Sequence, residues 1–533
     1  MSTPLERHGG ADADADYETG HVVGQDNIEV FGLDIHNPVF IVSALTVIGF
    51  VAVTLLFQSE AKALLTALRP WLTSTFDWLF MLTGNLVVAV CALLVVSPWG
   101  RVRLGGPDAR PDHSYTSWFA MLFSAGMGIG LMFFGVLEPF YHMTEPPLGV
   151  PADDAQAAAR VAMAATIFHW GIHPWAIYAV VGLALGLFAY NHDLPLSIRS
   201  AFYPLIGRRV FGWPGHVIDT LAVFATLIGL ATSLGFGASQ AAAGLHDLFD
   251  VPQTLQTKVL LIVAITMVAT MSVVAGLDAG IRRLSQLNMV LAIALLVFVI
   301  VAGPTLFILT SIPQATIDYL RYLPALSNWV DRPDTEFLHG WTTFYWAWWI
   351  SWSPFVGMFI ARVSRGRTVR EFITAACLVP LAVTVVWMTA MGGTAIHQYL
   401  ADGYQGVMQT MRDGTPELSL YRMLAPLPLG GVASAVGVVL VIVFFVTSSD
   451  SGSLVFDTIT AGGKLEAPVA QRVFWAAFEG LVAIALLVGG GLAALRAAAI
   501  STGLPFALVL IAMCASLLVG LRREYHRSAG LRS

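Results

Sequence analysis

The sequence predicts an all-α polytopic membrane protein, and two observations lead to this fold class. The chain of 533 residues is 56% hydrophobic and only 12% charged, whereas an average soluble domain is about 25% charged. Apolar runs of about 20 residues, the length at which a helix crosses a bilayer, recur along the whole chain. Cys91, Cys377 and Cys514 lie in such runs without a pairing motif, so no disulfide or metal framework is expected.

Twelve apolar runs are expected to form transmembrane helices, with edges placed to within a few residues. In chain order these are 38–57, 76–98, 117–142, 162–190, 217–243, 257–276, 286–312, 341–361, 370–397, 430–457, 470–490 and 497–520. Most Lys and Arg residues fall in the connections on one side, which indicates that both termini face the cytoplasm. The chain therefore divides into a disordered acidic cytoplasmic tail at 1–36, a transmembrane domain at 37–520 and a short basic cytoplasmic tail at 521–533.

Two of the expected helices carry residues that disfavour regular helix. The third has three glycines at alternate positions within 126–130, and the eighth contains Ser353-Pro354. Each opens a block of five helices, at about 117–312 and 341–520, and an odd number of crossings inverts the second block. Broken helices at matching places in inverted halves are typical of secondary transporters. The sequence thus predicts two inverted five-helix repeats, the LeuT-like arrangement, preceded by two extra helices.

The eighth expected helix holds five tryptophans between Trp341 and Trp352. The faces of tryptophan rings attract cations that lack hydrogen-bond donors, such as quaternary ammonium groups. An aromatic belt at the membrane surface, the alternative interpretation, places one or two rings at each end of a span instead. At about 100° per residue, Trp349, Trp352 and Phe359 share one arc of the helix. We therefore interpret the cluster as a cage for an ammonium group.

Three segments of the chain resemble one transporter family: Gly126–Pro139, Phe168–Tyr178, and Trp341–Phe359 with the following Ala361–Arg367. Over nearly all of 38–520 the chain is similar to the betaine/choline/carnitine transporter (BCCT) family, in particular to its sodium-coupled glycine betaine transporters. The resemblance implies a symporter, not an enzyme, that imports glycine betaine or a similar quaternary ammonium or sulfonium zwitterion with sodium for osmoprotection. It also implies a homotrimer in the lipid bilayer of the bacterial inner membrane, no cofactor other than sodium as coupling ion, and no nucleic-acid partner.

The resemblance carries over a set of substrate-binding positions. The positions that match the path and cage of the ammonium group are Trp170, Trp175, Tyr178, Trp349 and Trp352, with Phe344 and Phe359 further along the path. The broken backbone at Gly126, Met127, Gly128 and Gly130 is expected to receive the substrate carboxylate, as half-helix N-termini do in other transporters. For any single ring, packing against lipid or core is the alternative.

A sodium site is also implied by the resemblance. In sodium-coupled members the matching positions supply carbonyls and hydroxyls, and here they are Ser124, Met127, Phe444, Thr447 and Ser448. Hydrogen bonding of the two hydroxyls to the preceding helical turn is the alternative.

A possible second sodium site would use Thr226 and Phe355. Leu230 stands where the two-sodium pattern has a threonine, and leucine cannot coordinate sodium. This departure puts a second sodium ion, and a coupling ratio of two ions to one substrate, in doubt.

Two single positions bear on the coupling ion. Proton-coupled choline transporters of this family carry an aspartate where this chain has Gly130, and sodium-independent carnitine exchangers carry an arginine that aligns with Met289. Both residues here are uncharged, which favours sodium and a zwitterion. A proton-coupled choline importer remains the alternative function.

Two other functional classes fit the sequence less well. His169 and His173 have the i, i+4 spacing of a metal site, but Trp170-Gly171-Ile172 between them contains no acid, as a metallohydrolase of this type requires. A channel would need a continuous pore, whereas broken helices and a closed aromatic cage favour alternating access.

Overall fold

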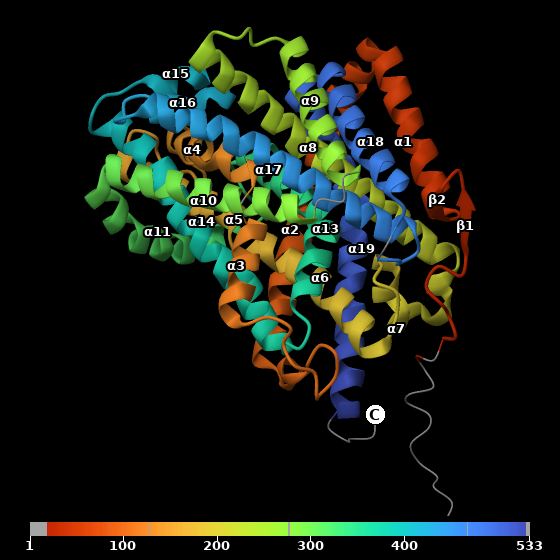
Figure 1. The fold of residues 1–533 in the computed structure, drawn as a ribbon. Helices are drawn as coiled ribbons and strands as arrows, with labels where there is room; N and C mark the ends of the chain where they lie inside the picture. The colour runs from red at the N-terminus through yellow and green to blue at the C-terminus, as the bar shows by residue number, and fades with distance from the viewer. Residues whose placement is uncertain (1–16, 18, 127, 275–277, 466, 529–533) are drawn as a thin grey trace, which may run out of the picture.

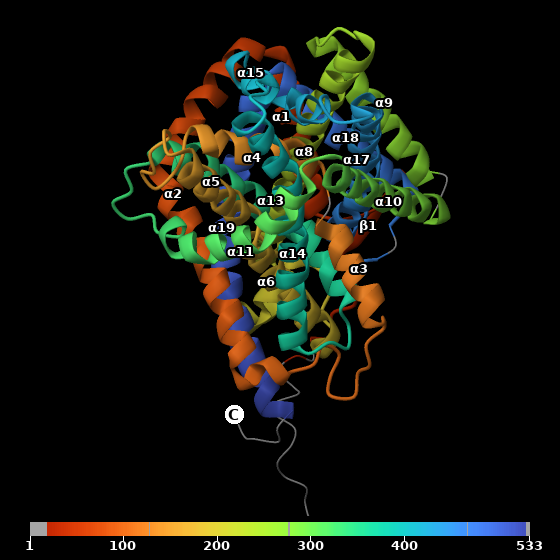
Figure 2. The same cartoon turned by 90° about the vertical axis from the view of Figure 1, so that its left-hand side faces the viewer.

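The computed structural model describes residues 17, 19–126, 128–274, 278–465 and 467–528, almost entirely as helices. A short hairpin of β1 (Asn27–Val30) and β2 (Leu33–His36) comes first. The helices then follow in chain order as α1 (Val39–Leu56), α2 (Gln58–Val96), η1 (Pro98–Arg101), α3 (Tyr115–Gly126), α4 (Ile129–Thr144), α5 (Ala155–Trp170), α6 (Ile172–His192), η2 (Ile198–Phe202), α7 (Tyr203–Ile206), η3 (Gly207–Phe211), α8 (Trp213–Phe249), α9 (Leu255–Val274), α10 (Asp278–Ala302), α11 (Thr305–Leu326), α12 (Thr335–Phe337), η4 (Leu338–Thr342), α13 (Thr343–Val363), α14 (Val369–Leu400), α15 (Gly406–Arg412), η5 (Pro416–Leu418), α16 (Ser419–Leu424), α17 (Gly430–Thr460), α18 (Val469–Val488) and α19 (Gly491–Ser528). Figures 1 and 2 show α15 near one end of the bundle and the C-terminal end of α19 at the other.

A helix occupies the place of each of the twelve expected spans, which confirms an all-α polytopic membrane protein. In the described part of the chain, 10 helical stretches are long and apolar enough to cross a membrane, or 11 if the bent pair α3 and α4 is counted as one span. The Trp-rich helix α13 is not among them. Met127 lies outside the described residues, as do residues 1–16 and 529–533 of the two expected tails.

The break expected at 126–130 is present. Helix α3 ends at Gly126, α4 begins at Ile129, and the two helices are bent by 65° relative to each other. Gly128, the N-cap residue of α4, is fully extended, with φ −169° and ψ −177°. The chain therefore leaves helical geometry in the middle of this span.

The break expected at Ser353-Pro354 is wrong, because α13 runs without interruption through Pro354. Proline cannot donate the hydrogen bond that the carbonyl four residues earlier would accept. The hydroxyl of Ser353 donates to that carbonyl, on Ile350, at 2.7 Å. The side chain of the preceding residue thus replaces the missing backbone donor.

A break that the sequence did not lead us to expect divides the fourth span between α5 and α6 at Gly171. Three side chains satisfy the backbone groups at this break. The hydroxyl of Thr384 donates to the Trp170 carbonyl at 3.0 Å, and the Trp349 indole donates to the His169 carbonyl at 2.9 Å. The Ile172 amide donates to the Tyr319 hydroxyl at 3.3 Å.

The seventh expected span, 286–312, extends too far toward the C-terminus. Helix α10 ends at Ala302, and a new helix, α11, starts at Thr305 after Pro304. Helix α11 is held to α5 by Arg160, whose Nε donates to Asp318 at 2.9 Å.

Helix α13 is approached closely by α6, α8 and α19. A methyl group on Gly182 of α6 would lie 2.9 Å from the Gly357 carbonyl, and one on Gly503 of α19 would lie 2.8 Å from the Ala347 carbonyl. A methyl group on Gly229 of α8 would lie 2.8 Å from the Trp352 ring. Small residues on three neighbouring helices therefore set the position of the Trp-rich helix, which lies in the middle of the bundle (Figure 2).

The expectation of a disordered tail through residue 36 is wrong for residues 27–36, which form the β1–β2 hairpin. Polar contacts anchor the hairpin to the end of α17 and to the loop after it. The side-chain amide of Asn27 donates to the Ala461 carbonyl at 3.0 Å, and Asp34 forms an ion pair with Lys464. The ring of His36 accepts a hydrogen bond from Arg199 at 3.0 Å and lies 3.3 Å from the ring of His216.

We predict that acid loosens this hairpin. Burial, followed by the positive charge of Arg199, lowers the pKa of His36 to about 3. The folded state therefore favours the neutral form of the His36 ring. The contribution of His36 to the free energy of unfolding is present above the ordinary pKa near 6.5 and is lost as the pH falls toward 3. At about pH 5 the loss is roughly 2 kcal/mol, which hydrogen exchange of the amides of 27–36, corrected for intrinsic rate, should report as a loss of protection of more than about tenfold.

His36→Gln is the matched control, because it removes the titrating ring. The pH dependence of exchange in the hairpin should disappear in this variant. The same pH dependence in both proteins would contradict the assignment to His36.

Candidate substrate and ion site

A cavity of about 210 Å³ lies where α3, α4, α5, α6, α8, α10, α13 and α17 meet. Its aromatic lining consists of Trp170, Tyr178, Trp348, Trp349, Trp352, Phe355, Phe359 and Phe444. Its polar lining consists of Ser124, Ser233, Ser285, Asn288, Thr447, Ser448 and Ser451, with the backbone of Gly128 and Gly130 nearby. In the described part of the chain no charged side chain lines this cavity.

The rings form walls at right angles to one another. Trp170 and Trp349 meet edge to face with their centroids 5.0 Å apart and their planes at 90°. Tyr178 meets Trp349 in the same manner, at 5.7 Å and 77°. Trp348 lies 6.3 Å from Trp170 at 87°. Rings arranged in this way present several π faces to a shared volume, which is the geometry that holds a quaternary ammonium group.

Three polar atoms of the lining have no hydrogen-bond partner among the described residues. They are the Tyr178 hydroxyl, the Trp352 indole nitrogen and the Asn288 side-chain oxygen. Buried polar atoms are normally paired, with protein or with a bound molecule. Two donors and one acceptor are thus available to a polar ligand in the cavity.

Gly130 provides the space that the Trp170 ring occupies. A methyl group on this residue would lie 2.4 Å from the edge of the Trp170 ring and 3.2 Å from the ring of Trp348. The absence of a side chain at residue 130 is therefore a packing requirement of the aromatic wall.

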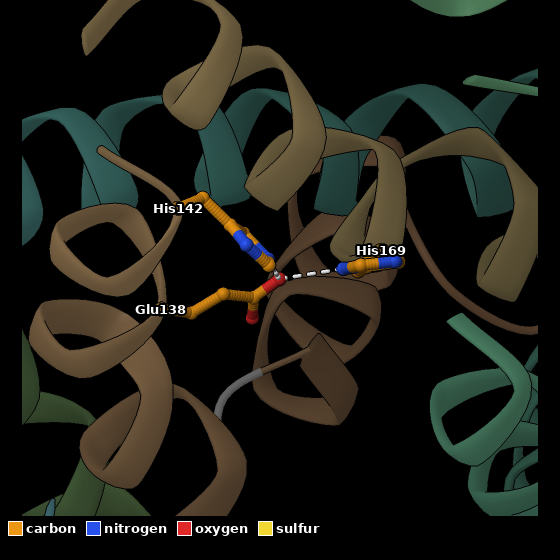
Figure 3. Close-up of side chains that lie close together, drawn as sticks. All are labelled: Glu138, His142 and His169. Atoms are coloured by element: carbon orange, nitrogen blue, oxygen red, sulfur yellow. Dashed lines mark hydrogen bonds and ion pairs between the residues drawn. The ribbon is translucent and has the colours of Figure 1, made fainter. Parts of the chain in front are cut away.

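A buried carboxylate, Glu138 of α4, fixes the other edge of Trp170. Its Oε2 accepts from the Trp170 indole at 2.7 Å and from the Tyr345 hydroxyl at 2.5 Å. Its Oε1 lies 2.6 Å from Nδ1 of His169 and 3.5 Å from Nε2 of His142. Figure 3 shows the carboxylate between the two imidazole rings. One carboxylate thus joins α4, α5 and α13 directly behind the cavity wall.

Glu138, His142 and His169 also form a group whose ligand atoms lie within 4.8 Å of one another, close enough to hold a metal ion. The carboxylate is already engaged by the donors from α5 and α13, so hydrogen bonding accounts for the arrangement. The sequence pair His169 and His173 does not converge, because His173 bonds instead to the side chain of Asn85 at 3.0 Å. This geometry gives no support to a metallohydrolase.

Four of the five residues of the predicted sodium site line the cavity: Ser124, Phe444, Thr447 and Ser448. They come from α3 and α17. The Thr447 hydroxyl donates to the carbonyls of Val443 and Phe444, at 3.1 and 3.0 Å, which is the alternative weighed from the sequence. A hydroxyl that donates in this way keeps lone pairs for a cation, so both roles are compatible.

The possible second sodium site is not assembled in the same way. Phe355 lines the cavity, but Thr226 is buried away from it and its hydroxyl donates to the Ala222 carbonyl at 2.8 Å. Leu230 packs against α17, where a methyl group on Gly452 would lie 2.5 Å from it. An apolar contact thus occupies the region where the family pattern has a further hydroxyl.

Two predicted substrate residues lie behind the lining. Trp175 packs edge to face on Tyr178 at 5.4 Å, and Phe344 stacks on Trp348 at 5.5 Å. The structure adds Trp348, which the Trp-rich segment already contained. It also adds a face of α10, where Met289, weighed above for the coupling ion, lines the cavity together with Ser285 and Asn288, which sequence reasoning missed. The three residues share the i, i+3, i+4 spacing of helical neighbours, which is the signal that could have found Ser285 and Asn288.

Comparison with known proteins identifies the family of the chain. The model of the betaine/carnitine/choline family of transporters matches residues 38–526. A glycine betaine/proline/choline transporter of Vibrio parahaemolyticus is 55% identical, over 95% of this chain and 94% of its own length. A glycine betaine transporter of Acinetobacter baylyi is 45% identical, over 91% of this chain and 73% of its own.

An osmo-dependent choline transporter of Acinetobacter baylyi is 40% identical, over 93% of this chain and 72% of its own length. These relatives are transporters rather than enzymes, and the family model covers nearly the whole chain. The chain therefore belongs to the betaine/carnitine/choline transporter family.

Proposed function

We propose that this protein is a secondary symporter that imports glycine betaine, or a similar quaternary ammonium or sulfonium zwitterion, together with sodium. The observation that carries the proposal is the cavity, in which perpendicular aromatic rings, unpaired polar atoms and a hydroxyl face of α17 surround one volume. The relatives named above as glycine betaine transporters support this substrate class. The physiological role would be uptake of a compatible solute for osmoprotection.

The chemistry of the lining favours a zwitterion over a cation. Each ring that faces a desolvated ammonium group contributes about 1–2 kcal/mol, so several rings can hold it without a carboxylate. A bare cation in a cavity whose described lining has no acid would remain electrostatically uncompensated. A zwitterion brings its own negative group, which the Tyr178 hydroxyl, the Trp352 indole and the amides of the α3–α4 break could receive.

The proposed sodium site lies where α3 and α17 face the cavity. Sodium is a hard cation and prefers oxygen ligands, which Ser124, Phe444, Thr447 and Ser448 supply as carbonyls or hydroxyls. Met127, the fifth predicted ligand, lies outside the described residues. A cation at this place would act electrostatically on a substrate carboxylate in the same cavity, which would couple the two binding events.

The proposed architecture is twelve spans, with two inverted five-helix repeats at about 117–312 and 341–520 after two extra helices. The packing supports a repeat. The contact of α6 with α13 has its counterpart in that of α14 with α4, and the contact of α8 with α19 in that of α17 with α10. The contacts α8–α17 and α9–α18 each pair corresponding helices of the two blocks. If each helix is replaced by the corresponding helix of the other five-helix block, the same kinds of helix pairs are in contact. Alternating access between inverted repeats requires such a symmetry.

We place the protein in the bacterial inner membrane, with the N-terminal segment 1–36 and the C-terminal segment 521–533 in the cytoplasm, because Lys and Arg concentrate on that side. We further propose assembly as a homotrimer, which rests on the family resemblance alone.

A proton-coupled choline importer is the second candidate. The names of two relatives include choline, which favours it. Uptake of labelled glycine betaine into proteoliposomes separates the two functions when a sodium gradient or a proton gradient is imposed alone, with choline as competitor. Sodium-driven uptake that resists choline supports the first function, whereas proton-driven uptake that choline inhibits supports the second and contradicts the first.

Replacement of Trp352 should abolish saturable uptake. Trp352→Leu keeps an apolar side chain but removes a ring face and the unpaired indole donor, so we expect a loss of initial rate of more than about tenfold. Trp213→Leu is the control, since Trp213 is exposed outside the cavity. Size-exclusion profiles of both variants establish folding, and normal saturable uptake by folded Trp352→Leu would contradict the cage.

Loss of both hydroxyls on α17 should weaken sodium binding. In the double variant Thr447→Ala, Ser448→Ala we expect the sodium concentration for half-maximal uptake to rise by about tenfold or more, because two oxygen ligands are lost. Ser453→Ala, which removes a buried hydroxyl on the same helix outside the cavity lining, should leave it unchanged. An unchanged sodium concentration for half-maximal uptake in the double variant would mean that the ion binds elsewhere.

A methyl group on Gly130 should displace Trp170. The clash of 2.4 Å with the ring predicts that Gly130→Ala raises the KM for glycine betaine by about tenfold. The matched control is Gly49→Ala on α1, where the added methyl group meets no atom within 4 Å. Equal KM values in the two variants would show that the position of Trp170 does not depend on Gly130.

A further inference from the structure

The hydrogen bonds that hold the Glu138 carboxylate do not include the neighbouring side chain of His142. This residue is only 1% exposed, yet neither nitrogen of its ring makes a hydrogen bond with the described part of the chain. Nε2 lies 3.5 Å from Oε1 of Glu138, beyond the usual hydrogen-bond range of about 2.7–3.2 Å. Figure 3 shows the ring directed at the carboxylate. A buried imidazole without a partner is available as a ligand.

His169 of α5 approaches the same carboxylate oxygen. Its Nδ1 lies 2.6 Å from Oε1 of Glu138, and its Nε2 lies 2.9 Å from the Thr342 hydroxyl. That hydroxyl donates to the Phe337 carbonyl at 3.5 Å, which leaves its lone pairs to accept from Nε2–H. With the proton on Nε2, two acceptors face each other, the Nδ1 lone pair and the carboxylate oxygen. A cation between these two atoms, either a proton or a metal ion, is then required.

Outer hydrogen bonds orient the groups that converge here. Oε2 of Glu138 accepts from the Trp170 indole and the Tyr345 hydroxyl, which fixes the carboxylate and leaves Oε1 for a further ligand. Thr342 fixes the ring of His169 in the same way. Carboxylates and imidazoles that bind metal ions usually have such outer partners, which set their orientation and the imidazole tautomer. The surroundings of these side chains thus match those of metal ligands.

The donor atoms indicate the class of ion. Two imidazole nitrogens and one carboxylate oxygen suit a divalent transition metal such as Zn²⁺, whereas hard cations prefer oxygen ligands. In a tetrahedral Zn²⁺ site with bonds of about 2.0–2.1 Å, neighbouring ligand atoms lie about 3.3 Å apart. The three ligand atoms here lie within 4.8 Å of one another, with one pair at 3.5 Å and one at 2.6 Å. Side-chain shifts of about 1.5 Å or less would complete the site.

A second cavity, of about 650 Å³, provides access to these ligands. His142 lines this cavity together with Tyr141 and Trp341. The cavity shares no lining residue with the one that contains the aromatic cage. Zn²⁺ sites with three protein ligands keep a fourth position for water, which the second cavity can supply. Its charged lining consists of three acids and two arginines, so its charge does not exclude a cation.

We propose that Glu138, His142 and His169 form a binding site for a divalent transition-metal ion, Zn²⁺ in particular, that is reached from this second cavity. The ion replaces the proton between His169 and Glu138, which passes to solvent, and it binds the unpartnered Nε2 of His142. It joins α4 to α5 while the bonds of Trp170 and Tyr345 to Oε2 stay in place. The metal site does not depend on which substrate or coupling ion the protein transports.

Isothermal titration calorimetry with ZnCl₂ tests this site on the full-length protein, purified without a histidine tag and freed of metal with a chelator. We expect the wild type to bind one Zn²⁺ per chain. His142→Gln removes a ligand and should weaken binding by more than about tenfold. Thr342→Val removes the hydrogen bond that orients His169 and should weaken it by about tenfold. His173→Gln is the matched control, since this buried histidine bonds to Asn85 instead, and it should bind Zn²⁺ like the wild type.

Absence of stoichiometric binding by the wild type would overturn the proposal. Equal affinities of the wild type and His142→Gln would also overturn it, as would an equal loss of affinity in His173→Gln. The X-ray absorption spectrum of the Zn²⁺-loaded wild type keeps the test open if the variants do not fold. It should show two imidazole nitrogens and oxygen ligands at about 2.0–2.2 Å, whereas a sulfur ligand or a shell of oxygen atoms alone would contradict the site.

Discussion

The buried carboxylate of Glu138 is the interaction on which the rest of the site depends. It lies at zero exposure and receives donors from two other helices, the Trp170 indole and the Tyr345 hydroxyl among them. Removal of such a carboxylate would leave several buried donors unpaired at once, at about 1–3 kcal/mol each. Its second oxygen faces His142, which lines a larger cavity of about 650 Å³ at the end of α4, while Trp170 lines the cavity described above. One residue therefore contacts side chains that line both cavities and holds these side chains in position.

The second constraint is the close packing of α13 against its neighbouring helices. Its rings need a rigid support, because an ammonium group gains from several faces only when they stay in position. Glycines on α6, α8 and α19 let the backbones approach closely enough to hold the helix on three sides. Close approach through small residues is the usual means of helix association in membranes. The same packing leaves no room for side chains at residues 130 and 229, so the cage and its support are one structure.

Apolar runs were enough to predict the helices, and the Trp-rich segment was enough to predict that rings of α13 line the cavity, since both depend on local sequence. The lining residues Ser124, Trp170, Tyr178, Phe444, Thr447 and Ser448 were expected only from the family resemblance. One error was local, because the neighbouring Ser353 completes the hydrogen bonding that Pro354 interrupts. The other errors arose where distant parts of the chain decide the outcome. The backbone groups at the Gly171 break are satisfied by Thr384 and Tyr319, far along the chain. The hairpin at 27–36 is stabilised by contacts with 461–464 that no local pattern contains. The clustering of Glu138 with its donors likewise depends on tertiary packing.

We propose that the cavity between α3, α13 and α17 holds the substrate by its ammonium group. A cryo-EM structure of the protein with glycine betaine and sodium would test this site. We expect density for the trimethylammonium group within about 6 Å of the centroids of Trp170, Trp349 and Trp352, with the carboxylate toward the α3–α4 break. Ligand density elsewhere, with those rings in contact only with one another, would contradict it.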